Sequence, residues 1–288
     1  MATHAMVDEV RLRRFARLAA PLLRSSTQQG FGLQVAQGKA GTGLEFLDLR
    51  AYATGEDARH IDWRQSQLRN QLLMRSYRDE TASDWTICVD GSASMQDEQK
   101  WQRVCELAVA LAYLLLHVGH RVSFIVFAER IVARIAAGRG QRQFAAISHE
   151  LQNYLPPASG GGSLPGLCAP LLHGRQDVFL LSDFLRADLM REDLLQLCAH
   201  SKSLAALQVL ARDEVVLARR GSSLLTDTES GERLRLDLDS RAVQSASAAL
   251  AEHNAALQRV MQSLNIHFSA ARSGGSWEQT LMAHFGHR

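Results

Sequence analysis

From Trp85 onward, strand-like and helix-like segments alternate along the chain, and this alternation constrains the fold more than any other feature of the sequence. The strand-like runs are short, apolar and rich in β-branched or aromatic residues, and they cover 85–90, 121–128, 177–181 and 204–210. Helical patterns lie between them, at 100–118, 141–154 and 189–200. Because such alternation produces a parallel sheet with helices on both faces, the sequence predicts an α/β fold with a doubly wound, mainly parallel sheet.

The chain is predicted to have three parts. Residues 1–83 form an N-terminal helix and a β-rich appendage, residues 84–215 form the α/β core, and residues 216–288 complete the fold with a hairpin and helices. In the first part, 7–23 reads as a basic amphipathic helix, and 44–52 and 72–77 read as strands. The apolar side of that helix is expected to carry Val10, Leu12, Phe15, Leu18 and Leu22.

Further segments of the core and the C-terminal part carry specific expectations. A short strand at 131–135 is close enough to 121–128 to form a hairpin, and 164–172 is expected to begin another helix. The last part reads as a hairpin, a long helix, a short strand and a terminal helix, at 223–239, 240–264, 266–270 and 277–285.

Composition excludes several classes of function. A formal net charge of +2 over 288 residues gives no reason to expect nucleic acid as a partner. The longest apolar run, 107–116, is shorter than the ~20 residues of a membrane-spanning helix, and the first residues lack a secretory signal pattern. We therefore expect a cytoplasmic protein without a membrane span. The four cysteines have no CxxC spacing and are expected to be buried free thiols, and His284 and His287 are expected to be solvated rather than zinc ligands.

Oxygen-bearing side chains follow two of the predicted strands. Asp90, Ser92 and Ser94 come directly after 85–90, and Asp183 follows 177–181. Ser163 lies in a glycine-rich loop between them. Because ligands of open α/β sheets bind at the carboxyl ends of strands, these oxygens are expected to surround one point. Hard divalent cations such as Mg²⁺ prefer such ligands, so the sequence predicts a metal site. The alternative is that these residues only form turns and helix caps.

The pattern Asp90-x-Ser92-x-Ser94 resembles the metal-ion-dependent adhesion site of von Willebrand factor A domains. The resemblance implies that the serines bind the metal directly, that Asp90 and Asp183 act mainly through water, and that a partner's carboxylate fills an open position. The family's loop threonine is missing here. Alignment on Leu164 puts Gly162 at its place, whereas alignment on the preceding glycines puts Ser163 there. Binding of the cation is therefore expected to be weak.

A longer resemblance covers about residues 30–215. The segment FLDLRAYATGEDARHIDW, residues 46–63, is similar to the signature of the domain of unknown function 58 family, with Glu56 in place of an aspartate, and Glu80 matches a further acidic position. Arg50, Asp57, Arg59, Asp62 and Trp63 are interpreted as a structural ion-pair and packing cluster. The resemblance implies a von Willebrand factor A-like fold and a role beside MoxR-type AAA+ ATPases.

Two functions follow as hypotheses. The preferred one is a metal-assisted protein-binding module, an adaptor or chaperone-like partner of a MoxR-type AAA+ ATPase or of a client that offers a carboxylate. The alternative is a Mg²⁺-dependent hydrolase or phosphotransferase that uses Asp90 and Asp183. Against an enzyme, the sequence shows no general base with an evident role, no P-loop, and Ser92 where a dehalogenase-type phosphatase needs a second carboxylate.

Overall fold

The computed structural model describes most of the chain. The described residues are 7–28, 45–52, 61–69, 71–78, 83–160, 162–173, 176–186, 188–215, 221–226, 233–238, 240–271 and 275–286. They fall into two compact units: Met1–Gln34 together with Ser83–Arg288, and Val35–Ala82. The N-terminal helix α1 (Glu9–Gln28) therefore belongs to the larger unit, although it lies within the segment 1–83 that the sequence groups as one part.

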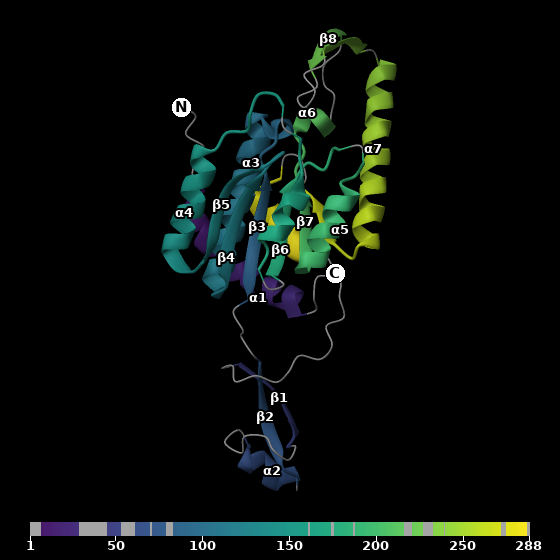
Figure 1. Ribbon diagram of the computed structural model, residues 1–288. Helices are drawn as coiled ribbons and strands as arrows, with labels where there is room; N and C mark the ends of the chain where they lie inside the picture. The colour runs from purple at the N-terminus through teal and green to yellow at the C-terminus, as the bar shows by residue number, and fades with distance from the viewer. Residues whose placement is uncertain are drawn as a thin grey trace. The chain divides into compact units, whose positions relative to one another are not determined.

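A six-stranded sheet forms the centre of the larger unit (Figure 1). Its strands are β3 (Asp84–Asp90), β4 (Arg121–Phe127), β5 (Ile131–Gly138), β6 (Gln176–Ser182), β7 (Ser201–Gln208) and β10 (His267–Ala270). They lie in the order β10-β7-β6-β3-β4-β5, and every pair is parallel except the β4–β5 hairpin. The predicted α/β fold with a mainly parallel sheet is confirmed.

The strand order places a topological switch point between β3 and β6. From β3 the chain continues to β4 on one side, and β6 then pairs with the other side of β3. In doubly wound sheets the loops after two such strands diverge to opposite faces and leave a crevice at the carboxyl edge. Asp90 ends β3, and Asp183 follows β6, so both aspartates lie at this edge.

Helices cover both faces of the sheet (Figure 1). One apolar cluster joins the sheet to α1, α3 (Glu98–Val118), α4 (Gly140–Asn153) and α8 (Trp277–Gly286). The other joins it to the 3₁₀ helix η3 (Pro165–Leu171), α5 (Arg191–His200) and α7 (Ser240–Ser263). Alternation along β3 serves both clusters, because Ile87 and Val89 face the first and Cys88 faces the second.

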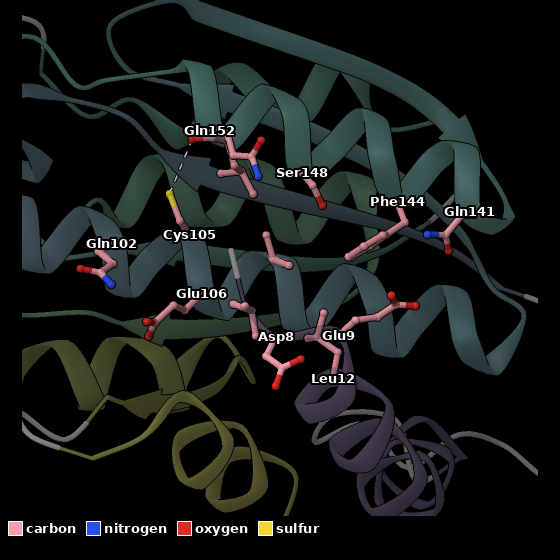
Figure 2. Close-up of a pocket in the computed structure, with 13 residues that line it drawn as sticks. Asp8, Glu9, Leu12, Gln102, Cys105, Glu106, Gln141, Phe144, Ser148 and Gln152 are labelled. Carbon is pink, nitrogen blue, oxygen red and sulfur yellow. Dashed lines mark hydrogen bonds between the residues drawn. The ribbon is translucent and has the colours of Figure 1, made fainter. Parts of the chain in front are cut away.

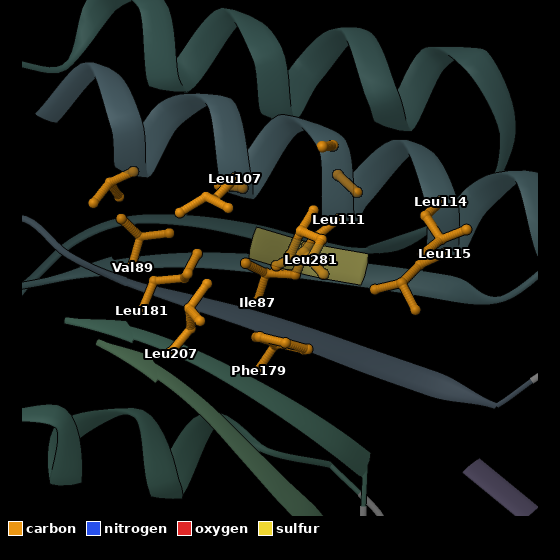
Figure 3. Packing of buried hydrophobic residues seen from close by; sticks show 14 of the residues in the cluster. Ile87, Val89, Leu107, Leu111, Leu114, Leu115, Phe179, Leu181, Leu207 and Leu281 are labelled. Carbon is orange, nitrogen blue, oxygen red and sulfur yellow. The ribbon is translucent and has the colours of Figure 1, made fainter. Parts of the chain in front are cut away.

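The central helix α3 packs on the sheet through a leucine-rich face. Figure 3 shows Leu107, Leu111 and Leu115 directed toward residues of the strands beneath them. In the described part of the chain, α3 is the single helix that is long and apolar enough to cross a membrane. More than half of its most apolar stretch is buried inside this fold. Its apolar composition is explained by its position in the core.

The smaller elements complete the two units. An antiparallel pair, β1 (Glu45–Ala51) and β2 (Leu73–Arg78), lies with α2 (Trp63–Arg69) in the Val35–Ala82 unit. In the larger unit, β8 (Gly221–Thr226) and β9 (Arg233–Leu238) form the expected hairpin, and a single turn, α6 (Arg212–Val215), follows β7.

Two expectations about helices are met in part. A helix does form at 165–171, but it is a 3₁₀ helix, with Pro165 at its start and Pro170 inside it. Helix α1 buries Leu12 and Phe15 as expected, whereas Val10 and Leu18 are 72% and 59% exposed. Its buried stripe consists of Leu12, Phe15, Ala16, Ala19 and Leu23. The alanines let α1 approach its neighbours closely, and a search for large apolar residues overlooks them.

The expectation for His284 is also wrong. Its side chain is fully buried, the ring lies 4.9 Å from that of Phe179, and Nδ1 is 2.6 Å from the Ser269 hydroxyl. The terminal helix carries it under the edge strand β10, so a position near the end of the sequence did not make it solvent-accessible. His287 lies outside the described residues.

Candidate functional site

Asp90 is a fully buried carboxylate held by hydroxyl and amide donors. Oδ2 accepts hydrogen bonds from the hydroxyls of Ser163 and Ser182, each at 2.6 Å, and Oδ1 accepts one from the backbone N–H of Ser92 at 2.9 Å. Burial raises the pKa of Asp90, the nearby charge of Asp183 raises it further, and the hydrogen bonds oppose both effects. Within the described part of the chain, no lysine or arginine forms an ion pair with Asp90.

Ser92 and Ser94 lie next to each other in the turn after β3. Their hydroxyl oxygens are 3.1 Å apart, and Ser92 is fully buried. Ser92 precedes a 3₁₀ turn, Ala93–Met95, but its side chain makes no capping hydrogen bond. A capping role therefore does not account for the Ser92 hydroxyl, which contacts the hydroxyl of Ser94 instead.

Asp183 is paired with a buried lysine that lies outside the predicted set of site residues. Lys100, on α3, donates from Nζ to Asp183 Oδ2 at 2.8 Å, to the carbonyl oxygen of Ser94 at 2.9 Å and to Glu214 Oε1 at 2.8 Å. Its side chain is completely inaccessible to solvent. Burial lowers the pKa of Lys100, but the charges of Asp183 and Glu214 outweigh burial, so the pKa lies above its usual value and the ammonium is charged.

Lys100 carried a weak signal in the sequence. It lies four and seven residues before Val104 and Leu107, on the face of α3 that is otherwise apolar and buried. A lysine on such a face is unusual and needs a charged partner. Glu214 carried no comparable signal, because it lies in the one-turn helix α6, far from the other site residues in sequence.

Neighbouring side chains fix the loops around the site. Gly91 is needed for close packing, because a Cβ there would lie 2.6 Å from the ring of Tyr154 and 2.7 Å from Val126. The Tyr154 hydroxyl donates to the Gly91 carbonyl at 2.6 Å. Arg186 donates to the Ser163 carbonyl at 2.6 Å and pairs with Asp193, which fixes the loop that carries Ser163.

The structure thus brings the five predicted site residues to one edge of the sheet. Ser163 contacts Asp90 directly, Ser92 and Ser94 contact each other, and Lys100 joins Asp183 to the Ser94 backbone. A side chain at Gly162 would meet no atom within 4 Å, whereas the hydroxyl of Ser163 already reaches Asp90. The expected doubly wound sheet therefore positions all five, although their role toward a metal stays a prediction.

The oxygen donors of the site suit a hard cation, but the charge of one of the two aspartates is already balanced. All its atoms are oxygens, and the buried Asp90 has no positively charged partner among the described residues. However, Lys100 already neutralises Asp183. No group of three or more His, Cys, Asp and Glu side chains in the described ranges could hold a metal, so a cation here would depend on the serine hydroxyls.

The N-terminal motif is only partly visible. Residues 53–60, which include Gly55, Asp57 and Arg59, and also Glu80, lie outside the described residues. Asp62 directly precedes α2 and accepts a hydrogen bond from the N–H of Gln65 at 3.1 Å. Trp63 is 62% exposed, so the expected packing role is not seen for its indole.

A pocket of about 280 Å³ lies apart from these residues, between α1, α3 and α4 (Figure 2). None of the five predicted site residues lines it. Cys105 lies on its wall and contacts the Leu151 carbonyl, and burial raises the pKa of this thiol to about 12. Cys88, Cys105 and Cys168 are buried free thiols, as expected, whereas Cys198 is half-buried.

Comparisons with known proteins identify relatives along most of the chain. Uncharacterized protein Rv1480 of Mycobacterium tuberculosis and uncharacterized protein Mb1516 of Mycobacterium bovis are each 24% identical over 247 residues, which cover 82% of this chain and 77% of theirs. Among solved structures, an aerotolerance-related membrane protein from Bacteroides fragilis aligns with a TM-score of 0.40 at 16% identity, over 64% of this chain and 98% of that one. BatB from Bacteroides thetaiotaomicron aligns with a TM-score of 0.41 at 12% identity, over 71% and 97%. Residues 48–256 match the family described as protein of unknown function DUF58, and the chain belongs to that family.

Proposed function

We propose that this chain is a von Willebrand factor A-like module that binds a partner protein through a divalent cation held at Asp90, Ser92, Ser94, Ser163 and Asp183. The observation that carries the proposal is the buried Asp90 carboxylate at the switch point, surrounded by hydroxyls and without a positively charged partner in the described part of the chain. A buried charge of this kind is costly unless it is balanced. A cation such as Mg²⁺ supplies that balance and, when bound, attracts a carboxylate from the partner.

Each residue of the site has a different proposed role toward the cation. Asp90 provides the buried negative charge, and the adjacent hydroxyls of Ser92 and Ser94 offer neutral oxygens beside it. Ser163 replaces the family's loop threonine, because its hydroxyl reaches Asp90 while position 162 has no side chain. Asp183, held by Lys100, lies across the switch point and adds charge at longer range.

The partner is proposed from the resemblance to proteins that act beside MoxR-type AAA+ ATPases. A partner or client that presents an Asp or Glu side chain fits a cation with an open position. The proposed complex is cytoplasmic, in line with the expectation from the sequence, and it contains no nucleic acid, because the net charge is close to neutral. Helix α3, which is long enough to span a membrane, is used in the core instead.

The test is capture of a MoxR-type ATPase from the same organism by purified protein. Wild type is expected to capture it with Mg²⁺ and to lose it with EDTA, whereas Asp90→Ala should fail in both conditions while its thermal melt remains cooperative. Glu252→Gln, which changes an exposed carboxylate on α7, serves as the matched control and should behave as wild type. Equal capture by wild type and Asp90→Ala, with or without EDTA, would place binding outside this site.

The alternative, a Mg²⁺-dependent hydrolase or phosphotransferase, has less support. Such an enzyme needs a carboxylate free to attack or to take a proton. Both oxygens of Asp90 accept hydrogen bonds, and Asp183 is bound to the Lys100 ammonium. These contacts favour a binding role over a catalytic one.

A further inference from the structure

Lys100 places a full positive charge inside the candidate cation site. We propose that Lys100 is a tethered cation of this site, which supplies part of the charge balance itself and thereby limits the affinity for a divalent ion. This inference rests on the proposed function, because it concerns how the same site selects its cation. It predicts that the metal affinity is set by a residue that does not bind the metal.

The geometry of the ammonium supports this role. Its three hydrogen bonds, at 2.8, 2.9 and 2.8 Å, use all three donors of a lysine ammonium. Two of the three acceptors belong to Asp183 and Ser94, which are themselves candidate site residues. The positive charge therefore lies one hydrogen bond away from two members of the site, where it repels a second cation.

Lys100 is held in place by its position at the start of α3 and by the burial of its side chain. It lies in the first turn of α3, where Asp97 caps the helix and accepts a hydrogen bond from the Lys100 N–H at 2.8 Å. Its side chain has no solvent-accessible area, so it cannot turn outward into water without unpacking the site. Glu214 is also held, because its second oxygen accepts from the Ala211 N–H at 2.7 Å.

The charges show which way each substitution should act. The site and its surroundings hold one ammonium, which pairs with Asp183 and Glu214, and a third carboxylate, that of Asp90, so an excess of negative charge remains that a divalent ion can neutralise. Removing the ammonium increases that excess, and removing Glu214 decreases it. Lys100 and Glu214 substitutions should therefore shift metal affinity in opposite directions, although neither residue is a proposed ligand.

The experiment compares Mn²⁺ binding at constant ionic strength, by electron paramagnetic resonance of free Mn²⁺, in the full chain and its variants. Lys100→Gln is expected to bind at least about tenfold more tightly than wild type, since one repulsive charge at short range is removed. Glu214→Gln is expected to bind at least about threefold more weakly, and its half-exposed position makes loss of the fold a minor concern. Lys202→Gln, an exposed lysine on β7, is the matched control and should not change binding.

A second measurement, the melting temperature with and without Mn²⁺, shows whether the lysine variant is folded. Without metal, Lys100→Gln leaves Asp183 and Glu214 close together without their cation, so its melting temperature should fall, and Mn²⁺ should raise it more than it raises that of wild type. If Lys100→Gln does not fold without metal, refolding with and without Mn²⁺ gives the same comparison.

The outcomes separate this inference from the proposed function. If Asp90→Ala abolishes Mn²⁺ binding but Lys100→Gln and Glu214→Gln bind as wild type does, the cation site stands and the role of Lys100 is overturned. If Asp90→Ala binds as wild type does, the metal lies elsewhere and both are overturned. Both also fail if neither wild type nor Lys100→Gln binds Mn²⁺ at millimolar concentration.

Discussion

Two buried aspartates at the same sheet edge are stabilised in different ways. Asp183 has a full positive charge beside it, whereas Asp90 has only hydroxyl and amide donors. Hydrogen bonds from neutral donors stabilise a buried carboxylate less than an ion pair with good geometry does. Asp90 is therefore the residue of this site that gains most from an added cation, and Asp183 gains least.

An exposed tryptophan in the family motif gives a test that needs no partner. Of the four tryptophans, Trp85, Trp101 and Trp277 are buried, and Trp63 is 62% exposed. Acrylamide should therefore quench mainly the emission of Trp63, and Trp63→Phe should remove most of the quenchable fraction of the fluorescence. Trp101→Phe should leave that fraction unchanged. Quenching that persists in Trp63→Phe would show that another indole is accessible in solution.

Two buried serines, Ser148 and Ser163, should differ in how much their hydroxyl groups contribute to the stability of the fold. Ser148, on α4, points into the pocket of Figure 2, and its hydroxyl has no hydrogen-bond partner among the described residues. Ser163, before η3, donates to the Asp90 carboxylate. Both are more than nine-tenths buried, so they form a matched pair.

The two serines should respond in opposite ways to alanine. Ser148→Ala removes an unpaired polar group, so the free energy of unfolding should stay unchanged or rise by up to about 1 kcal/mol. Ser163→Ala removes a hydrogen bond to a charged acceptor and should lower it by about 1.5–3 kcal/mol. Urea denaturation followed by tryptophan fluorescence measures both. A larger loss for Ser148→Ala than for Ser163→Ala would contradict this assignment of the hydrogen bonds.

The elements of the larger unit were more predictable than the contacts between them. Strands such as β3 and β6 are buried on both faces, so each appears in the sequence as a continuous apolar run. The same logic placed Asp90 and Asp183 at the carboxyl edge. Pairing of Lys100 with Asp183 is a contact between α3 and the end of β6, and periodicity within one element carries no information about it. Ala16 and Ala19 in the buried stripe of α1 escape prediction for another reason, because a search for large apolar residues overlooks alanine.

In the whole molecule, a helix from the N-terminal region completes the core of a unit that begins again at Ser83. Phe15 lies with its ring 5.1 Å from that of Trp277, so the two ends of the chain pack together within this unit. Residues Val35–Ala82 form their own compact unit between these two segments. The chain therefore leaves the larger unit after α1 and returns to it before β3.

This arrangement predicts that removal of 35–82 and removal of 1–34 have very different effects. Replacement of 35–82 by a flexible linker of about 20 Gly and Ser residues, with a root-mean-square span of roughly 25 Å, should leave the larger unit folded and its melting temperature within a few degrees of wild type.

Deletion of 1–34 removes a stripe that includes the buried Leu12, Phe15 and Leu23. Each such side chain contributes about 1.5–3 kcal/mol on burial, and domains are typically stable by only about 5–15 kcal/mol. The variant that lacks 1–34 should therefore lose cooperative unfolding or aggregate. Thermal melts by circular dichroism compare the two directly, and a cooperative, wild-type melt after deletion of 1–34 would show that α1 is dispensable for the core.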